Sequence, residues 1–494
     1  GAAADVPAVA EWGSGSEVAG WEVPGGEIGG SEVGAPADPA SSEGWPQASE
    51  RAWTPAPGDT GEHRPPLDAP RAPVTLADTG LAADQVVQLV MKVLYAGEAS
   101  GLTLAERLCL PFQILEPLIE RSRAEQLIEV RGAIGTGAAT YRYALTDAGR
   151  VRARQFLDAN GYVGPAPVPL DAYVAAMKTL RDTRGFVNRE RIHRGFEHLV
   201  VHDSLFEQLG PAINAGKAVF LYGPAGNGKT VLAEGMGRTL GGEMFIPHAI
   251  DVDGQIITLY DPISHRAIDE EPRSSLLLSS ATHDRRWVKI RRPVVTVGGE
   301  LTLDMLDLTF NPIAKSYDAP IQLKANGGVF LVDDFGRQRM RPEELLNRWI
   351  VPLESRVDFL TLHTGRKFEV PFNVFIVFAT NLKPESLADE AFLRRIPYKI
   401  RAQNPTPDEY TRIFELNCRK RGVAFDPSVV DYLQKTYYQP RNLELRACHP
   451  RDLVEQVVDM CRYQQRETII TTELLDAACA NYFVEESSSQ GNEQ

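Results

Sequence analysis

The spacing of apolar and polar positions separates an irregular N-terminal segment from a longer, regularly patterned remainder. Residues 1–74 show neither helical nor strand periodicity and are rich in Gly, Pro, Ala, Ser and Glu. Such a segment cannot bury enough apolar surface to offset its ordering entropy, so it is predicted to be a disordered tail. Four of the six tryptophans lie in it. They indicate either incidental aromatics in a solubilising tail or short docking motifs that order on a partner.

Beyond the tail, the pattern predicts a small α+β domain over residues 75–160. Apolar residues recur at helical spacing in three consecutive segments, 82–97, 103–110 and 111–126, and Thr103 is the expected N-cap of the second helix. The next stretch alternates like a β-hairpin, and residues 147–158 return to helix.

Three helices followed by a two-stranded wing resemble a winged-helix domain, in which the third helix would enter a DNA groove. Here that helix carries three glutamates beside two arginines: Glu116, Glu120 and Glu125 with Arg121 and Arg123. Because this is not a phosphate-seeking face, a protein-docking or structural role is favoured over DNA binding.

The rest of the chain predicts an α/β core followed by helices. A proline-rich linker is expected at 161–189, and short apolar strands alternate with helices over 190–403, with an insert at about 252–325. Residues 404–485 read as helices only, and 486–494 as an acidic tail. The predicted fold class is α/β, a parallel sheet between helices with a C-terminal helical lid.

The stretch FLYGPAGNGKT carries the clearest chemistry. It fits G-x-x-x-x-G-K-[ST] between an apolar strand and a helix. The loop's N–H groups and the following helix N-terminus suit phosphates, Lys229 would reach the β and γ phosphates, and Thr230 would ligate Mg²⁺. The predicted ATP-binding residues are Gly223, Pro224, Ala225, Gly226, Asn227, Gly228, Lys229, Thr230 and Val231.

Two later strands supply the groups that a phosphate-binding loop needs as partners. GGVFLVDDFG ends an apolar strand in Asp333, expected to hold the Mg²⁺, and Asp334, expected to polarise the attacking water. FNVFIVFATN ends in Asn381, whose amide can orient that water. The preceding stretch, 357–371, predicts an extra hairpin around the turn at 363–366.

With these motifs in this order along the chain, residues 190–485 resemble an AAA+ ATPase. The resemblance implies that Gly223 to Thr230 are Walker A, Asp333 and Asp334 Walker B, and Asn381 sensor 1. It further implies an arginine finger that reaches a neighbouring subunit at Arg395, with Arg394 beside it, and a sensor 2 arginine on the lid at Arg451. The extra hairpin is similar to that of the pre-sensor-1 superclade, which includes MoxR-like ATPases.

The implied activity is Mg²⁺-dependent ATP hydrolysis at the subunit interfaces of a homo-oligomeric ring, expected to be a hexamer. The leading client class is a protein that is remodelled or assembled, as by a MoxR-like chaperone. The alternative is a DNA-transaction ATPase, a loader, transposition helper or regulator that uses the winged helix. A third interpretation is a slow or inactive nucleotide-gated switch, because the second Walker B acid is Asp334 where most of the family has glutamate.

The insert adds two candidate contact regions. Its start follows EMFIPHAI, the expected second strand of the core sheet, so Ile257 or Tyr260 could grip a polypeptide in a central pore. The basic stretch HDRRWVKIRRP could instead contact phosphates or a neighbouring subunit. A solvated surface elaboration explains both regions equally well.

Net charge and cysteine spacing exclude few classes of function. The net charge is −14, but residues 1–74 hold twelve acids and three arginines, so the folded part is only mildly acidic and DNA is neither demanded nor forbidden. The five cysteines show no zinc-ligand spacing. No apolar run of membrane-spanning length and no secretory signal are found, which makes a cytoplasmic protein the expectation.

Overall fold

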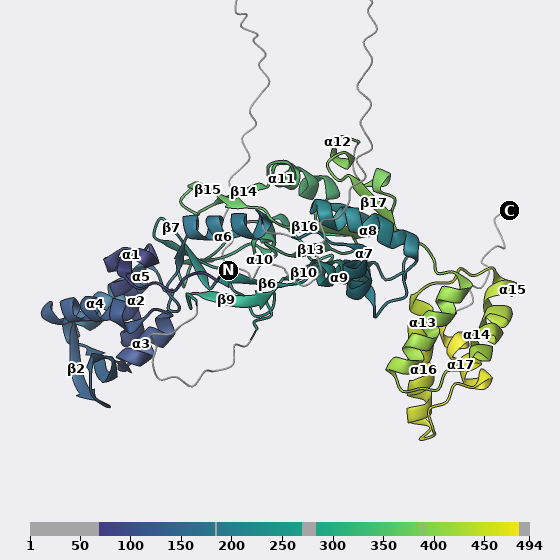
Figure 1. The fold of residues 1–494 in the computed structure, drawn as a ribbon, viewed down its shortest axis with the longest axis horizontal. Coiled ribbons are helices and arrows are strands. Elements are labelled where there is room, and N and C mark those ends of the chain that lie inside the picture. Colours follow the sequence, from purple (N-terminus) through teal and green to yellow (C-terminus); the bar gives the residue numbers. More distant parts are fainter. Residues whose placement is uncertain (1–68, 183–184, 269–282, 388–389, 484–494) are drawn as a thin grey trace, which may run out of the picture. The chain divides into compact units, whose positions relative to one another are not determined.

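A computed structural model describes residues 69–182, 185–268, 283–387 and 390–483, shown as coloured ribbon in Figure 1. Most of the predicted disordered tail, residues 1–68, and the whole predicted C-terminal tail, 486–494, therefore lie outside the described residues. The described residues all belong to one compact unit of the chain, Arg64–Gln494.

The N-terminal part contains the predicted helices and hairpin. In chain order its elements are α1 Leu76–Thr79, α2 Ala83–Tyr95, β1 Ala99–Ser100, α3 Gly101–Leu108, α4 Phe112–Ala124, β2 Ile128–Ala133, β3 Tyr141–Leu145 and α5 Asp147–Ala159. The strands form one antiparallel sheet in the order β1-β3-β2. The helices and this sheet close over a core of their own that includes Leu89, Leu104 and Tyr143.

The N-cap predicted for the second helix is wrong. Helix α3 begins two residues earlier than Thr103, and Ser100 is its N-cap, with the Ser100 hydroxyl accepting a hydrogen bond from the Thr103 N–H. Both residue types cap helices well. Thr103 occupies the position whose N–H needs a partner, and Ser100 supplies the oxygen.

A five-stranded parallel sheet forms the middle of the chain, in the order β10-β13-β16-β5-β17. Its strands are β5 Val219–Tyr222, β10 Val294–Val297, β13 Val329–Val332, β16 Phe375–Thr380 and β17 Tyr398–Arg401. Side chains alternate between its two faces. One face packs on α7 Arg189–Phe196, α8 Asp203–Ala215 and α9 Lys229–Leu240, and the other on α11 Pro342–Ser355. The predicted sheet between helices is confirmed.

The strand assignment inside this sheet differs from the prediction at one place. EMFIPHAI does not enter the sheet: its first part is β6 Glu243–Pro247, which pairs antiparallel with β9 Trp287–Arg291. Strand β10 takes the expected place beside the Walker B strand β13. Most of the inserted chain therefore precedes the second core strand rather than following it.

A smaller sheet gathers strands from the insert and from the segment predicted as a linker, in the order β11-β12-β8-β7-β4. These strands are β4 Val168–Pro169, β7 Ala249–Val252, β8 Gln255–Thr258, β11 Thr309–Asn311 and β12 Ser316–Asp318. Helices α6 Leu170–Asp182 and α10 Ile321–Lys324 lie beside them along the chain. The range 161–189 thus contains a strand and a helix. The predicted extra hairpin is present as β14 Val357–Thr361 and β15 Lys367–Pro371.

The C-terminal helices form a separate bundle with its own core (Figure 1). After the short helix α12 Glu390–Leu393, the bundle contains α13 Pro407–Lys420, α14 Pro427–Leu433, a π-helical turn Gln434–Tyr438, α15 Gln439–Arg441, α16 Cys448–Tyr463 and α17 Thr472–Tyr482. Its buried residues include Phe414, Leu453 and Leu475. The predicted helical lid is confirmed. In the described part of the chain, no helix is long and apolar enough to span a membrane.

Candidate nucleotide site

The glycine-rich loop connects the end of β5 to the start of α9 at Lys229. Three of its glycines have positive φ, 143° at Gly223, 84° at Gly226 and 69° at Gly228, a conformation that residues with a Cβ adopt rarely. The first N–H groups of α9 have no partner within their own helix and carry partial positive charge. The loop and the helix terminus together form a cradle for an anion.

Lys229 lies inside this cradle and is only 7% exposed. Its Nζ donates hydrogen bonds to the carbonyls of Gly223 at 3.1 Å and Pro224 at 3.0 Å, and to Asn381 Oδ1 at 2.6 Å. Burial lowers the pKa of Lys229, while the carboxylates of Asp333 and Asp334 act in the opposite direction. An amine already separated from bulk water interacts strongly with phosphate charge.

Thr230 and Asp333 face each other across the ends of α9 and β13. The Thr230 hydroxyl donates to Asp333 Oδ2 at 2.6 Å. A hydroxyl and a carboxylate at this separation present the hard oxygen ligands that Mg²⁺ prefers. The structure therefore brings together the two residues predicted to hold the metal ion.

Asp334 and Asn381 complete the same edge of the sheet. Asn381 Nδ2 donates to Asp334 Oδ1 at 3.4 Å while its Oδ1 accepts from Lys229, so one amide contacts both groups. Asp334 has a left-handed backbone, φ 49°, and is exposed, whereas Asp333 is half-buried. The arrangement leaves the Asp334 carboxylate facing solvent where a water molecule could be polarised.

The lid contacts the loop directly. Asn227 Nδ2 donates to Asn404 Oδ1 at 2.7 Å, the Ala447 N–H donates to Asn227 Oδ1 at 3.3 Å, and the Cys448 N–H donates to the Gly226 carbonyl at 2.8 Å. A Cβ placed on Gly226 would come within 2.5 Å of Cys448 Sγ. The start of α16 is therefore packed against the phosphate-binding loop.

A cavity of about 790 Å³ lies over these groups. Its lining includes the predicted residues Ala225 to Val231, both Walker B acids, Asn381 and Arg451. Within its lining, Arg451 donates to Asp452 Oδ1 at 2.7 Å, and this bond raises the pKa of the arginine. A volume of this size suits a nucleotide.

Several lining residues were missed by sequence reasoning. An apolar wall comes from Leu199, Val200 and Val201 before α8 and from Ile413 and Leu416 on α13, and further polar groups come from Arg337, Asn417 and Lys420. Arg337 is three residues beyond Asp334, so its place in the Walker B stretch could have signalled it. The others carry no local signal, because they reach the cavity only through tertiary packing.

The described residues fit a magnesium nucleotide. Lys229 and the loop N–H groups match phosphates, Thr230 and Asp333 match the metal ion, and the apolar wall matches a flat base. Bound there, the nucleotide would supply the reactive phosphate and its metal ion. The chain's own residues would bind and orient the nucleotide and its metal ion, and would exclude water around them.

The strand order and the helical bundle together indicate the type of P-loop fold. The sensor strand β16 lies between the P-loop strand β5 and the Walker B strand β13, and a helical lid follows the sheet. This is an AAA+ ATPase fold. It agrees with the resemblance carried by the motifs, and it is shown by the chain's own sheet and site.

Comparisons with known proteins add little beyond this. A family described as a domain of unknown function (DUF8689) matches residues 406–481, which lie in the lid. None of the curated proteins matches the chain.

Among solved structures, NtrX from Brucella abortus is 16% identical with a TM-score of 0.37, covering 62% of this chain and 61% of its own. The Holliday junction branch migration motor RuvB from Thermotoga maritima is 16% identical with a TM-score of 0.31, covering 61% and 72%. This chain thus spans less than two thirds of NtrX. Neither likeness carries an argument about function.

The structure does not bring Arg394 and Arg395 into the cavity of their own chain. Arg394 pairs with Glu390 at 2.8 Å on α12 and is 77% exposed, and Arg395 pairs with Glu354 at 2.6 Å. Their assignment as an arginine finger stays a prediction.

Of the two residues proposed to grip a polypeptide, Ile257 is buried, which contradicts that role, and Tyr260 is half-buried. Ile257 is 1% exposed in β8, and the Tyr260 ring stacks on His265 at 5.9 Å between centroids. Both side chains contribute to the packing around the small sheet.

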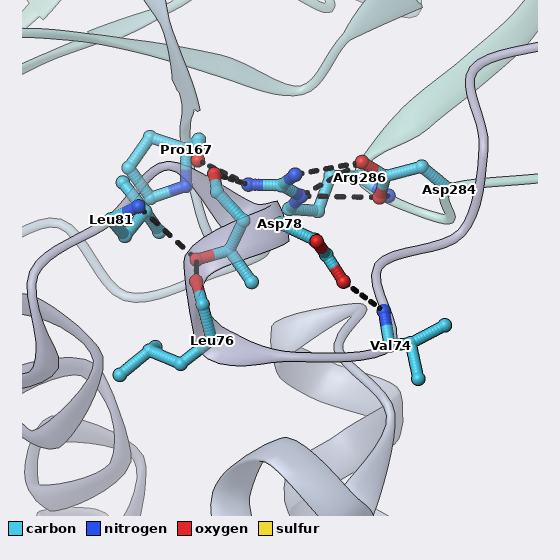
Figure 2. Close-up of polar contacts among 8 residues, drawn as sticks. Val74, Leu76, Asp78, Leu81, Pro167, Asp284 and Arg286 are labelled. Atoms are coloured by element: carbon cyan, nitrogen blue, oxygen red, sulfur yellow. Dashed lines mark hydrogen bonds and ion pairs between the residues drawn. The ribbon is translucent and has the colours of Figure 1, made fainter.

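The basic stretch 283–293 is likewise largely structural. Arg286 is 3% exposed and forms an ion pair with Asp284, with Nη2 2.8 Å from Oδ2 (Figure 2). Its Nη1 donates to the carbonyls of Thr79 and Pro167. Arg292 Nη1 donates to the Gly327 carbonyl. Only Arg285 and Arg291 of the four arginines are exposed, which reduces the surface that could contact phosphates.

Proposed function

We propose that this protein is a Mg²⁺-dependent AAA+ ATPase that works as a homo-oligomeric ring, expected to be a hexamer, and remodels or assembles a protein client. The observation that carries the activity is the chain of contacts from Thr230 to Asp333 and from Lys229 through Asn381 to Asp334. It joins groups for the metal ion, the phosphates and the attacking water in one cavity.

Shared sites are supported by the position of the paired arginines. Charge builds on the γ-phosphate oxygens as the bond breaks, and a guanidinium from a neighbouring subunit would stabilise it. Arg394 and Arg395 lie outside their own chain's cavity, with Arg394 largely exposed directly after α12. In a ring they would serve the next subunit, while Arg451 would serve the site of its own chain.

A protein client is supported by the charge distribution. On α4, Arg121 pairs with Glu125 and Arg123 with Glu120, so this face is neutralised within the helix. DNA is the second candidate client, since α5 carries three exposed arginines, Arg150, Arg152 and Arg154. The MoxR-like character rests only on the hairpin β14–β15.

The test is steady-state ATP hydrolysis against protein concentration with Mg²⁺, with and without duplex DNA. Activity per subunit is expected to rise with concentration and to fall about 10³-fold or more in Arg395→Ala or Arg394→Ala, whichever is the finger. Mixing each arginine variant with a Lys229→Ala chain should restore part of the activity. Each site would take its lysine from one subunit and its arginine from the neighbouring one, so a mixed ring would contain some sites with both residues intact.

Concentration-independent activity that both arginine variants retain would overturn the ring. DNA stimulation that disappears in Arg150→Gln/Arg154→Gln would favour the DNA-transaction ATPase. Tight ATP binding with undetectable turnover at every concentration would favour the nucleotide-gated switch.

A further inference from the structure

A second, smaller cavity lies at the edge of the core sheet opposite the nucleotide site. It measures about 160 Å³, and its lining includes Gly216, Gly327, Gly328 and Asn373, which lie within a few residues of the starts of β5, β13 and β16. The glycine-rich loop lies at the other, carboxyl ends of these parallel strands. The two cavities are therefore separated by the length of the sheet.

Three arginines line this cavity, from three different parts of the chain. Arg181 comes from the C-terminal turn of α6, Arg292 from the residues before β10, and Arg356 from the residue after α11. No carboxylate is among the described residues that line it. The acid paired with Arg181, Asp182, contacts it at 3.3 Å on the exposed side, with both side chains about half exposed.

Two of the guanidinium groups are held in place by backbone carbonyls. Arg356 Nη2 donates to the Gly216 carbonyl at 2.7 Å and Nη1 to the Val374 carbonyl at 3.3 Å, and Arg292 Nη1 donates to the Gly327 carbonyl at 2.5 Å. A guanidinium has five N–H donors, so the two carbonyl bonds of Arg356 hold its group in place while leaving it further donors. Fixed guanidinium groups bind oxyanions with little further loss of entropy.

Arg356 carries an electrostatic cost at this cavity. Burial lowers the pKa of Arg356, and the positive charge of Arg181 lowers it further. Positive charges gathered at a partly desolvated wall repel each other, and an anion between them relieves both that repulsion and the desolvation of the guanidinium groups.

We propose that these three arginines form a binding site for a small tetrahedral oxyanion of the phosphate class. The volume corresponds to about five water molecules, which leaves room for one such ion with some of its hydration and none for a nucleotide. The forked guanidinium geometry matches phosphate oxygens. The site is independent of the proposed ATPase activity.

The alternative is that the arginines serve only to tie strand starts to one another. Arg356 and Arg292 would do so through their carbonyl contacts, but Arg181 makes no such carbonyl contact in the described part of the chain. Arg181 is therefore the residue that separates the two interpretations, and its exposure means that it can be replaced without disturbing the core.

The experiment is isothermal titration calorimetry with inorganic phosphate, at constant ionic strength, in a Lys229→Ala background that removes phosphate binding by the nucleotide loop. One phosphate per chain is expected in this background. Arg181→Gln added to it should weaken binding about tenfold or more, as expected for losing a charged hydrogen bond. Arg150→Gln, an exposed arginine on α5, is the matched control and should change nothing.

Absence of binding in Lys229→Ala would overturn the proposal, since the nucleotide loop alone would then account for phosphate binding. Binding that survives both Arg181→Gln and Arg356→Gln unchanged would also overturn it. Nucleotide affinity of the single Arg181→Gln chain, expected to equal that of the unmodified protein, checks that the variant is folded.

Discussion

Asp334 combines a left-handed backbone with a short side chain at the point where we propose that water is activated. Aspartate tolerates this backbone region better than most residues do. Its carboxylate reaches only as far as Asn381 Nδ2, 3.4 Å away. A glutamate here would extend the carboxylate by one methylene.

We therefore expect Asp334→Glu to raise the rate of ATP hydrolysis, by up to about 10²-fold, because a misplacement of about 1 Å can cost that much in rate. Asp334→Asn, which has the same size but no charge, should lower the rate instead. Single-turnover hydrolysis at saturating ATP measures both. A glutamate variant no faster than the unmodified protein would show that the reach of Asp334 does not limit the reaction.

Residues of the site were predictable from the sequence where each belongs to a short local motif at the end of a strand. Lys229, Thr230, Asp333 and Asn381 follow apolar strands, and parallel strands bring such ends to one edge. Lys420 was not predictable, because it reaches the cavity from α13 only through the packing of the lid.

At the scale of elements, the contact between the phosphate-binding loop and α16 links the core to the lid. Gly226 and Gly365 provide a matched pair of substitutions, since both have φ 84° but only a Cβ at Gly226 would meet another residue. The same positive φ disfavours an alanine at both sites, and a larger effect at Gly226 reports the contact with Cys448.

Gly226→Ala is expected to weaken ATP binding, whereas Gly365→Ala should leave it unchanged, because only the first pushes the loop away from α16. Equilibrium binding of a fluorescent ATP analogue measures the difference. Adding Cys448→Ala to the Gly226 variant should restore part of the affinity by removing the clashing sulfur. Equal effects at both glycines would assign the loss to backbone strain alone.

The lid also carries a buried histidine whose titration affects its stability. His449 is 7% exposed, and its Nδ1 is 2.7 Å from the Tyr438 hydroxyl. Burial, helped by Arg446, lowers the pKa of His449 from 6.5 to about 4. Between these values the unfolded chain binds a proton that the folded lid does not, so folding weakens as pH falls.

We expect the lid to lose up to about 3 kcal/mol of unfolding free energy between pH 6.5 and pH 4 through His449. Urea unfolding followed at several pH values by the fluorescence of the lid tyrosines measures it. His449→Gln, which does not titrate in this range, should flatten the dependence. An unchanged slope in that variant would place the effect on other groups.

Element types were predictable, but the pairing of strands was not. Residues 243–247 and 294–297 are both short apolar runs, and either could fill the second place in the core sheet. The choice is made by long-range packing: β6 pairs with β9, and β10 with β13. A local pattern contains no information about such partners.

Over the whole molecule, Arg286, which is paired with Asp284, joins segments distant in sequence. Arg286 directly precedes β9. Its guanidinium also donates hydrogen bonds to the carbonyls of Thr79, at the end of α1, and of Pro167, before β4 (Figure 2). All three segments therefore depend on one guanidinium, and removing its acid would leave an unpaired buried charge.

Asp284→Ala is expected to destabilise the protein by about 3–5 kcal/mol, and Asp284→Ala/Arg286→Met by clearly less, because the double variant buries no lone charge. The shift in the urea midpoint measures both. Glu125→Ala, which breaks the exposed pair with Arg121, is the control and should cost less than about 1 kcal/mol. A double variant as unstable as the single one would show that the carbonyl contacts, not the charge, matter most.

The position of β5 in the sheet has a consequence for how the chain matures on the ribosome. Its neighbours are β16 and β17, which begin at Phe375 and Tyr398, so both partners of the P-loop strand are made more than 150 residues later. Until then β5 has two unpaired edges, and such edges invite aggregation. The nucleotide loop thus acquires its structure only after most of the chain has been synthesised, and a truncated product ending before β16 would present an open strand to chaperones.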